Sequence, residues 1–68
     1  MRMYEFATRL QQLREQRGIS RRALSELCGL SSNMVARYER SAQMPSLNHA
    51  AALADFFNVS IDYLTGRQ

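Results

Sequence analysis

The chain has 68 residues, 46% of them hydrophobic and 22% charged, which is the size and composition of one small globular domain and excludes a disordered segment. Nine basic against six acidic residues give a formal charge of +3, an excess that favours a polyanionic partner. All nine are arginine, a bias that fits phosphate and guanine recognition but that a GC-rich coding sequence would also produce.

One cysteine excludes an intramolecular disulfide and a cysteine-cluster zinc site. The longest apolar run, residues 50–54, is far shorter than the roughly 20 residues of a membrane span. We therefore expect a single soluble, cytoplasmic domain over residues 1–68, without a membrane segment.

Glycines and serines divide the chain into segments with helical periodicity, and no stretch alternates with the period of two that a half-buried strand shows. In chain order, we expect helices at residues 4–17, 21–28, 32–40, 47–57 and 61–65, with a loop at 41–45. The predicted N-caps are Ser20, Ser31, Ser46 and Ser60, and the predicted left-handed residues after helices are Gly18, Gly29 and Gly66. The expected fold class is therefore all-α, a compact five-helix bundle.

Apolar residues at helical spacing mark the expected core. The inward positions are Phe6, Leu10, Leu13, Leu24, Leu27, Cys28, Leu30, Val35, Tyr38, Leu47, Ala50, Ala51, Ala54, Phe57, Ile61 and Leu64. Cys28 is expected in the core because it occupies an inward position. His49 is expected at a surface or half-buried position, since no second metal ligand or nucleophile lies near it in the sequence. Met34 could pack inward, touch a thymine methyl group or lie against a sugar.

The segments at 21–28 and 32–40 are separated by only three residues, a length of turn that sets two helices at a steep angle in a helix-turn-helix. Gly29 lies where the chain must take a positive φ to reverse its direction. Ser25 lies where the two helices cross most closely, so a small side chain is needed there. These features predict a helix-turn-helix unit over residues 21–40.

The outer face of the helix expected at 32–40 carries hydroxyl, amide and guanidinium groups from Ser32, Asn33 and Arg37. Asn33 can bond adenine through two hydrogen bonds, and Arg37 can bond guanine in the same way. Because the two residues are four apart, they lie on one helical face. A solvated surface helix is the alternative, but such a helix usually mixes in glutamate and lysine, so we interpret this face as one that reads DNA.

A series of landmarks runs through the chain in a fixed order. They are Leu10, Leu13, Arg14, Gly18, Ser20, Leu24, Gly29, Ser31, Val35, Tyr38, Glu39, Pro45 and Ser46, followed by the tail at 59–64. With these spacings the chain resembles the XRE-type, or Cro/repressor-type, helix-turn-helix family over residues 6–66. The resemblance implies a five-helix bundle that binds operator DNA, commonly as a dimer.

The resemblance also implies roles for individual residues. Ser32, Asn33 and Arg37 match the base-reading positions of the family. Arg14 and Glu39 match a pair that forms an ion pair between the first and third helices, where a charge at the edge of a small core needs a partner.

Three positions depart from the pattern of the family. Arg21 stands where glutamine usually touches a backbone phosphate and supports the first reading residue; the phosphate contact survives this change, but the bridging amide does not. Ser41 stands where glycine is usual, so the loop after it is expected to differ. Ser25 replaces the commoner alanine.

The sequence therefore predicts a sequence-specific regulator of transcription, a repressor, that binds double-stranded DNA. The helix at 32–40 would read the major groove of a palindromic operator. The expected phosphate contacts are Arg21, Arg22, Arg40 and Gln43. The alternative is a protein-interaction module of the same fold, such as an antitoxin, whose binding to DNA would lack a steep dependence on salt.

Charge is unevenly distributed: residues 14–40 hold six arginines and three glutamates, a net +3, whereas residues 41–68 hold one arginine and two aspartates, a net −1. The C-terminal part is thus left for subunit contact in a homodimer. Phe56 and Tyr63 are the candidates for that contact, with core packing as the alternative. An enzyme is not expected, because no paired acid and base is visible, and neither is a cofactor, a metal or a small-molecule substrate.

Overall fold

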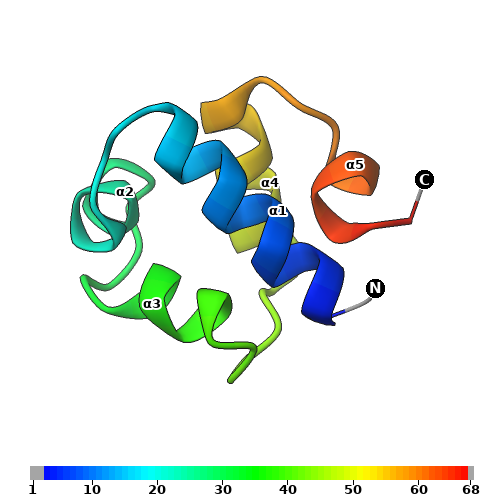
Figure 1. Ribbon diagram of the computed structural model, residues 1–68, viewed down its shortest axis with the longest axis horizontal. Helices are drawn as coiled ribbons and strands as arrows, with labels where there is room; N and C mark the ends of the chain where they lie inside the picture. Colours follow the sequence, from blue (N-terminus) through cyan, green and yellow to red (C-terminus); the bar gives the residue numbers. More distant parts are fainter. Residues whose placement is uncertain (1–2, 68) are drawn as a thin grey trace.

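The computed structural model describes residues 3–67 (Figure 1). Within this range the chain forms five helices and no strand. In chain order these are α1 (Met3–Gln16), α2 (Arg21–Leu27), α3 (Met34–Glu39), α4 (Leu47–Phe57) and α5 (Ile61–Thr65). The expected all-α bundle is confirmed.

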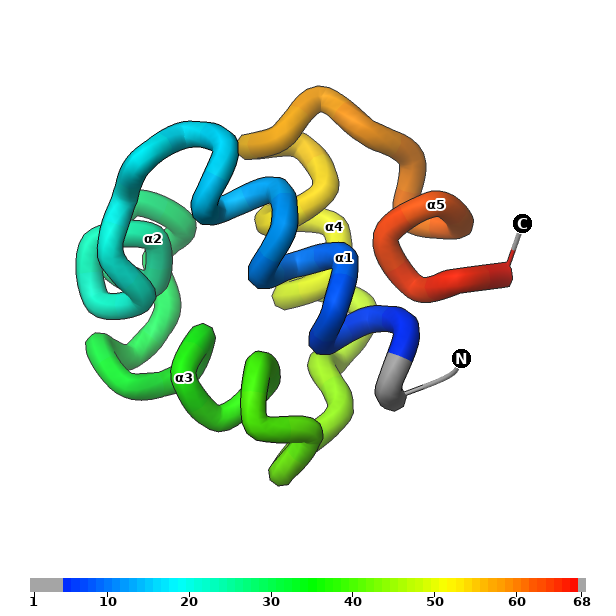
Figure 2. Tube along the Cα trace, viewed as in Figure 1, coloured from blue at the N-terminus to red at the C-terminus, as the bar shows by residue number. Residues whose placement is uncertain are grey.

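The arrangement of the helices places α2 and α3 together at one end of the bundle. α1 contacts both α3 and α5, α2 packs against α3, and α4 packs against α5. The tube view shows α2 and α3 on one side of α1 and α5 on the opposite side (Figure 2). The unit formed by α2 and α3 is therefore supported from within the molecule by α1.

Local capping chemistry explains where most of the helices begin. Ser20, Ser46 and Ser60 each accept, through the side-chain oxygen, a hydrogen bond of 2.9–3.2 Å from the backbone N–H three residues later. The three glycines after helical segments have φ values of 65°, 74° and 75°, the left-handed conformation predicted for them. Four of the helices consequently begin and end within one residue of their predicted bounds.

The third helix is the exception, because it begins at Met34 and not at residue 32. Ser31 is not its N-cap: the backbone carbonyl of Ser31, rather than its hydroxyl, accepts the N–H of Met34 at 3.0 Å. Asn33 occupies the N-cap position without a side-chain capping bond. Serine and asparagine form helices poorly, since their side chains compete for backbone groups, and this accounts for the shorter helix. Ser32 and Asn33 thus lie in the turn that precedes α3.

Side chains from all five described helices meet in one core. Its buried members are Phe6, Leu10, Leu24, Leu30, Val35, Tyr38, Leu53, Ala54, Phe57 and Leu64. Phe6 of α1 and Tyr38 of α3 meet edge to face with ring centroids 5.5 Å apart, which ties the first helix to the third. Met34 is half-buried and packs against this core, so of its three possible positions it takes the inward one.

Two of the predicted core positions are wrong. Leu27 is 62% exposed and Leu47 is 72% exposed, because they are the last residue of α2 and the first of α4, where no neighbouring helix covers them. Leu53, which the prediction passed over, is fully buried. It lies three residues after Ala50 and four before Phe57, so the helical spacing did carry a signal for it.

Candidate nucleic-acid interface

Ser25 joins the two helices of the helix-turn-helix unit. Its side chain is fully buried, and its hydroxyl donates a hydrogen bond of 2.9 Å to the carbonyl of Arg21. The same oxygen accepts a bond of 3.0 Å from the backbone N–H of Val35 in the first turn of α3. The small residue therefore leaves room for the close crossing and also supplies a link between α2 and α3 that alanine would lack.

The three predicted base-reading residues are all exposed at one place on this unit. Ser32 and Asn33 lie in the turn before α3, and Arg37 lies on α3 itself. Among the residues that the structure describes, none of the three side chains has a hydrogen-bond or ion-pair partner. Their hydroxyl, amide and guanidinium groups can therefore exchange water for a ligand without first breaking a bond within the protein.

The four predicted phosphate contacts differ in their surroundings. Arg22 donates from Nε to Glu26 Oε2 at 3.2 Å, and both of these side chains are well exposed. Arg40 is exposed and Gln43 is half-buried. The fourth, Arg21, has a side chain that is 55% exposed and that faces an acidic residue of α3.

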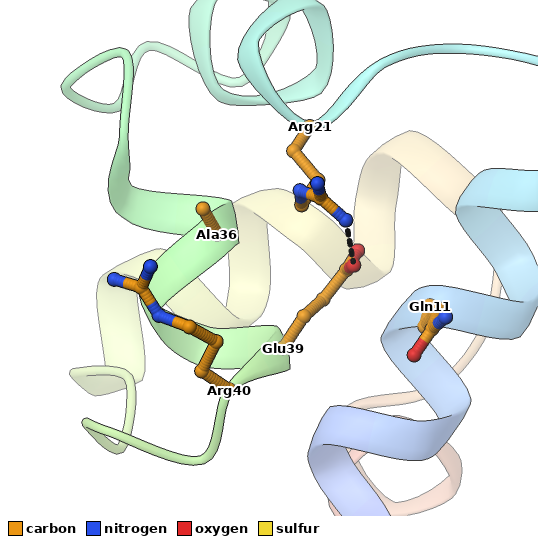
Figure 3. Close-up of a pocket in the computed structure, with 5 residues that line it drawn as sticks. All are labelled: Gln11, Arg21, Ala36, Glu39 and Arg40. Carbon is orange, nitrogen blue, oxygen red and sulfur yellow. Dashed lines mark ion pairs between the residues drawn. The ribbon is translucent and has the colours of Figure 1, made fainter.

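A hollow of about 220 Å³ lies between α1, α2 and α3 (Figure 3). Its lining residues are Gln11, Arg21, Ala36, Glu39 and Arg40. Figure 3 shows Arg21 reaching from the start of α2 toward Glu39, with Nη1 3.7 Å from Oε1. The Arg40 side chain extends past Ala36, away from Glu39 (Figure 3). Sequence reasoning did not anticipate the contact between Arg21 and Glu39, which depends on how the two helices cross.

Glu39, which lines this hollow, forms a bidentate ion pair with Arg14. Arg14 donates from Nε to Glu39 Oε2 at 2.6 Å and from Nη2 to Oε1 at 3.1 Å, and its Nη1 donates to the carbonyl of Ile19 at 2.8 Å. Their side chains are only 10% and 4% exposed. The hydrogen bonds to Glu39 raise the pKa of Arg14 above its ordinary value, although burial by itself would lower this pKa.

Tyr38 and His49 form a second link that the sequence did not reveal. The Tyr38 hydroxyl and His49 Nδ1 share a hydrogen bond of 2.9 Å, which connects α3 to the first turn of α4. Burial raises the pKa of Tyr38, so its hydroxyl stays protonated at neutral pH. His49 is half-buried, in keeping with the structural position expected of it.

Other candidate chemistry finds little support in the described part of the chain. Cys28 is half-buried against the core, and burial raises the pKa of its thiol, which suits a packing residue rather than a nucleophile. Within residues 3–67, no three histidine, cysteine or acidic side chains gather as metal ligands would. None of the described helices is long and apolar enough to cross a bilayer.

Comparison with known proteins identifies the fold. A family model described as helix-turn-helix matches residues 10–64. The chain belongs to the XRE-type helix-turn-helix family. The resemblance seen in the sequence is thus confirmed, and the match spans α2, α3, α4, the second half of α1 and most of α5.

Curated relatives of this chain come from Bacillus subtilis. It is 37% identical over 60 residues to the HTH-type transcriptional regulator AnsR, covering 88% of this chain and 52% of the relative. It is 31% identical over 61 residues to the uncharacterised HTH-type transcriptional regulator YobD, covering 90% and 54%. It is 30% identical over 59 residues to the HTH-type transcriptional regulator ImmR, covering 87% and 46%. The chain thus spans about half the length of the curated relatives it matches, and no solved structure matches it significantly.

The loop after α3 preserves a conformation suited to the glycine that is usual in this family. Ser41 has a φ of 57°, in the left-handed region that glycine enters freely and that a residue with a Cβ enters at a cost. The substitution of serine for glycine therefore leaves local strain in the backbone rather than abolishing the left-handed turn.

Replacing Ser41 by glycine is expected to raise the free energy of unfolding by about 0.5–1 kcal/mol, because the release of strain exceeds the added freedom of the unfolded chain. Thermal unfolding without ligand would measure the gain. Ser32→Gly is the matched control, since Ser32 lies in a turn but its φ is not positive. An equal gain in the free energy of unfolding at both positions, or no gain at Ser41, would contradict the interpretation that the backbone at Ser41 is strained.

The two candidates for subunit contact already have partners within the chain. The Phe56 ring is half-buried, meets Phe57 edge to face at 5.1 Å and lies 5.6 Å from the Arg17 guanidinium. Tyr63 is 39% exposed, and the guanidinium of Arg9 lies 4.6 Å above its ring. Of the two rings, Tyr63 therefore offers the larger accessible surface.

Proposed function

We propose that this domain is the DNA-binding part of a transcriptional regulator, a repressor, that recognises a specific double-stranded sequence. The observation that carries the proposal is the exposed group of Ser32, Asn33 and Arg37, whose polar side chains have no partner among the described residues. The membership of the chain in the helix-turn-helix family, and the naming of its relatives as transcriptional regulators, support the same function.

In this proposal α3 and the turn before it enter the major groove. Asn33 would bond the N6 and N7 edge of an adenine, Arg37 the O6 and N7 edge of a guanine, and Ser32 either base type. A donor that faces its complementary base exchanges a hydrogen bond to water for one to the DNA, whereas a donor that faces the wrong base loses the bond to water without replacing it. This difference in binding free energy produces specificity. Ser32 and Asn33, in the turn before α3, would read bases next to those read by Arg37 on α3 itself.

The phosphate backbone of the operator would be held by Arg21, Arg22, Arg40 and Gln43. Arginine suits this role because its planar guanidinium can donate two parallel hydrogen bonds to one phosphate. The net charge of +3 over residues 14–40 supports an attraction of this unit, rather than of the C-terminal part, to the polyanion.

We also propose that the protein binds a palindromic operator as a homodimer and acts in the cytoplasm. A two-fold symmetric pair of reading units requires half-sites about one helical turn apart on the DNA. The exposed Tyr63 ring on α5, with the half-buried Phe56 nearby in sequence, is the candidate contact between subunits. Both residues lie outside the α2–α3 unit, which leaves the reading surface free.

The proposed function is tested by DNA binding at several salt concentrations. Fluorescence anisotropy with a labelled duplex library should give an affinity that falls steeply with salt, since each phosphate contact releases condensed counterions. A selected duplex should bind more tightly than a scrambled one. An affinity for DNA that is absent or independent of salt would overturn the proposal and favour a protein-interaction module such as an antitoxin.

Arg21→Ala and Arg22→Ala should each weaken binding to every duplex and reduce the slope of log affinity against log salt by about one unit. Arg67→Ala is the matched control, because Arg67 is exposed and comes two residues after α5, the helix that lies on the opposite side of α1 from α2 and α3 (Figure 2). If Arg21→Ala and Arg22→Ala leave the slope unchanged, as Arg67→Ala is expected to do, α2 does not lie along the DNA backbone.

A further inference from the structure

The carboxylate of Glu39 on α3 interacts with two arginines, with one through hydrogen bonds and with the other through charge alone. Both oxygens of Glu39 accept hydrogen bonds from Arg14, at 2.6 and 3.1 Å. The second arginine, Arg21, has Nη1 3.7 Å from Oε1, which is close enough for attraction between charges but too long for a hydrogen bond. The carboxylate is therefore neutralised by Arg14 and also attracts Arg21.

This arrangement orients Arg21 without occupying its donors. Among the described residues the Arg21 side chain has this one ion pair and no hydrogen bond, so its N–H groups remain available. Two guanidinium groups and one carboxylate leave a net positive charge at the hollow, and the side chain of Arg21, one of its lining residues, is 55% exposed. An anion that approaches Arg21 consequently meets no uncompensated carboxylate.

We propose that Glu39 is a positioning residue for DNA binding, which holds the Arg21 guanidinium above the hollow so that it is ready to take one backbone phosphate of the operator. The inference rests on the proposed function and adds a second role for Glu39 beside its ion pair with Arg14. A long side chain loses conformational freedom when it binds, and an arginine that is already restrained loses less of it. Glu39 thereby increases the contribution of Arg21 to affinity.

The neighbouring arginine provides a matched comparison on the same helix. Arg22 Nε is 3.2 Å from Glu26 Oε2, but this pair lies four residues apart on α2 with side chains 77% and 56% exposed. Arg22 does donate a hydrogen bond to Glu26, but the Glu26 carboxylate is itself solvated, and such a pair restrains its members weakly. The Glu39 carboxylate is instead buried and fixed by its two hydrogen bonds from Arg14. No second arginine is paired with Glu26 in the described part of the chain. Glu26 should therefore have no comparable effect on Arg22.

The test is a double-mutant cycle on DNA affinity, measured by anisotropy with the selected duplex. Arg21→Ala is introduced into the unaltered protein and into Glu39→Gln. We expect it to weaken binding by about tenfold in the first background. In the second it should weaken binding roughly three- to tenfold less, the scale of the side-chain freedom that Glu39 removes. Arg22→Ala, in the unaltered protein and in Glu26→Gln, should have the same effect in both.

Glu39→Gln leaves Arg14 without its charged partner and could reduce folding. A third background, Arg14→Met/Glu39→Leu, is therefore added, because it carries no unpaired charge. Circular dichroism gives the folded fraction of every variant. If Glu39 only stabilised the fold, its replacement would lower the amount of active protein equally with and without Arg21→Ala. It would not change the ratio of affinities that Arg21→Ala produces.

Three results would overturn the inference in distinguishable ways. An equal effect of Arg21→Ala in all backgrounds would show that Glu39 does not position it, and a larger effect without Glu39 would show that the carboxylate competes with phosphate. No effect in the unaltered protein would remove Arg21 from the interface. In each case steep salt dependence of the unaltered protein would leave the proposed function intact, whereas its absence would overturn both.

Discussion

Removing the Arg14 guanidinium by Arg14→Met is expected to lower the free energy of unfolding by about 3–5 kcal/mol. The change leaves the Glu39 carboxylate, with a side chain only 4% exposed, without its two short hydrogen bonds and with Arg21 at 3.7 Å as its remaining cation. The carbonyl of Ile19 also loses the donor that lies 2.8 Å away. Since a small native domain has a stability of only about 5–15 kcal/mol, the melting temperature should fall sharply.

Glu39→Gln should destabilise the domain in the same direction, because Arg14 then keeps a buried charge with only Glu15 nearby, at 3.9 Å. The double variant Arg14→Met/Glu39→Leu should recover much of the loss, since neither charge remains in the core. Thermal or urea unfolding without DNA completes the cycle. The matched control is Arg22→Met, which breaks the exposed pair with Glu26 and should cost no more than about 1 kcal/mol. If the losses in free energy of unfolding of the two single variants simply add in the double variant, the two side chains are not energetically coupled.

Arg37→Ala is expected to cost about 1–3 kcal/mol of binding free energy on the preferred operator and to relax the preference at one base position. Arg37 is exposed and has no partner within the described residues, so its truncation should leave the melting temperature of the free protein nearly unchanged. Affinity measured against a set of duplexes with single base changes would locate the relaxed position. Asn33→Ala should act in the same way at a neighbouring base pair.

Arg37→Lys separates base reading from phosphate binding at this position. Lysine keeps the charge and therefore the salt slope, but it lacks the planar fork that bonds O6 and N7 of guanine together. We expect Arg37→Lys to reduce the preference for guanine while affinity for scrambled duplexes changes little. If Arg37→Ala weakens binding to all sequences equally, and lysine restores it fully, Arg37 contacts phosphate and does not read a base.

Local chemistry made most of the helix bounds predictable. An N-cap hydroxyl and a left-handed glycine act on their own few residues, so Ser20, Ser46 and Gly29 could be interpreted without knowledge of the fold. The same logic failed at Ser31, because three consecutive polar residues compete to end the turn and the helix begins only at Met34. Because all three residues can serve as a cap and all three form helices poorly, residue type alone did not show which of them would precede the helix.

Burial was less predictable than helix position. Helical spacing shows which residues share a face, but it does not show how far along the helix that face is covered. Leu27 and Leu47 share their faces with buried residues and are nevertheless exposed, whereas Leu53 is buried in the middle of α4. The ends of short helices therefore need the tertiary structure before they can be assigned to core or surface.

The sequence by itself determined the family, the five helices and the kinds of side chain presented on α3 and the turn before it, because these depend on residue type and spacing along the chain. Apart from the ion pair of Arg14 and Glu39, which the family resemblance implied, only the tertiary structure decided which polar side chains meet across helices. The contact of Arg21 with Glu39 and the bond between Tyr38 and His49 join different helices. Such pairs form where the crossing of two helices brings polar atoms within a few ångströms, and that distance is set by the packing of the whole core rather than by any local pattern.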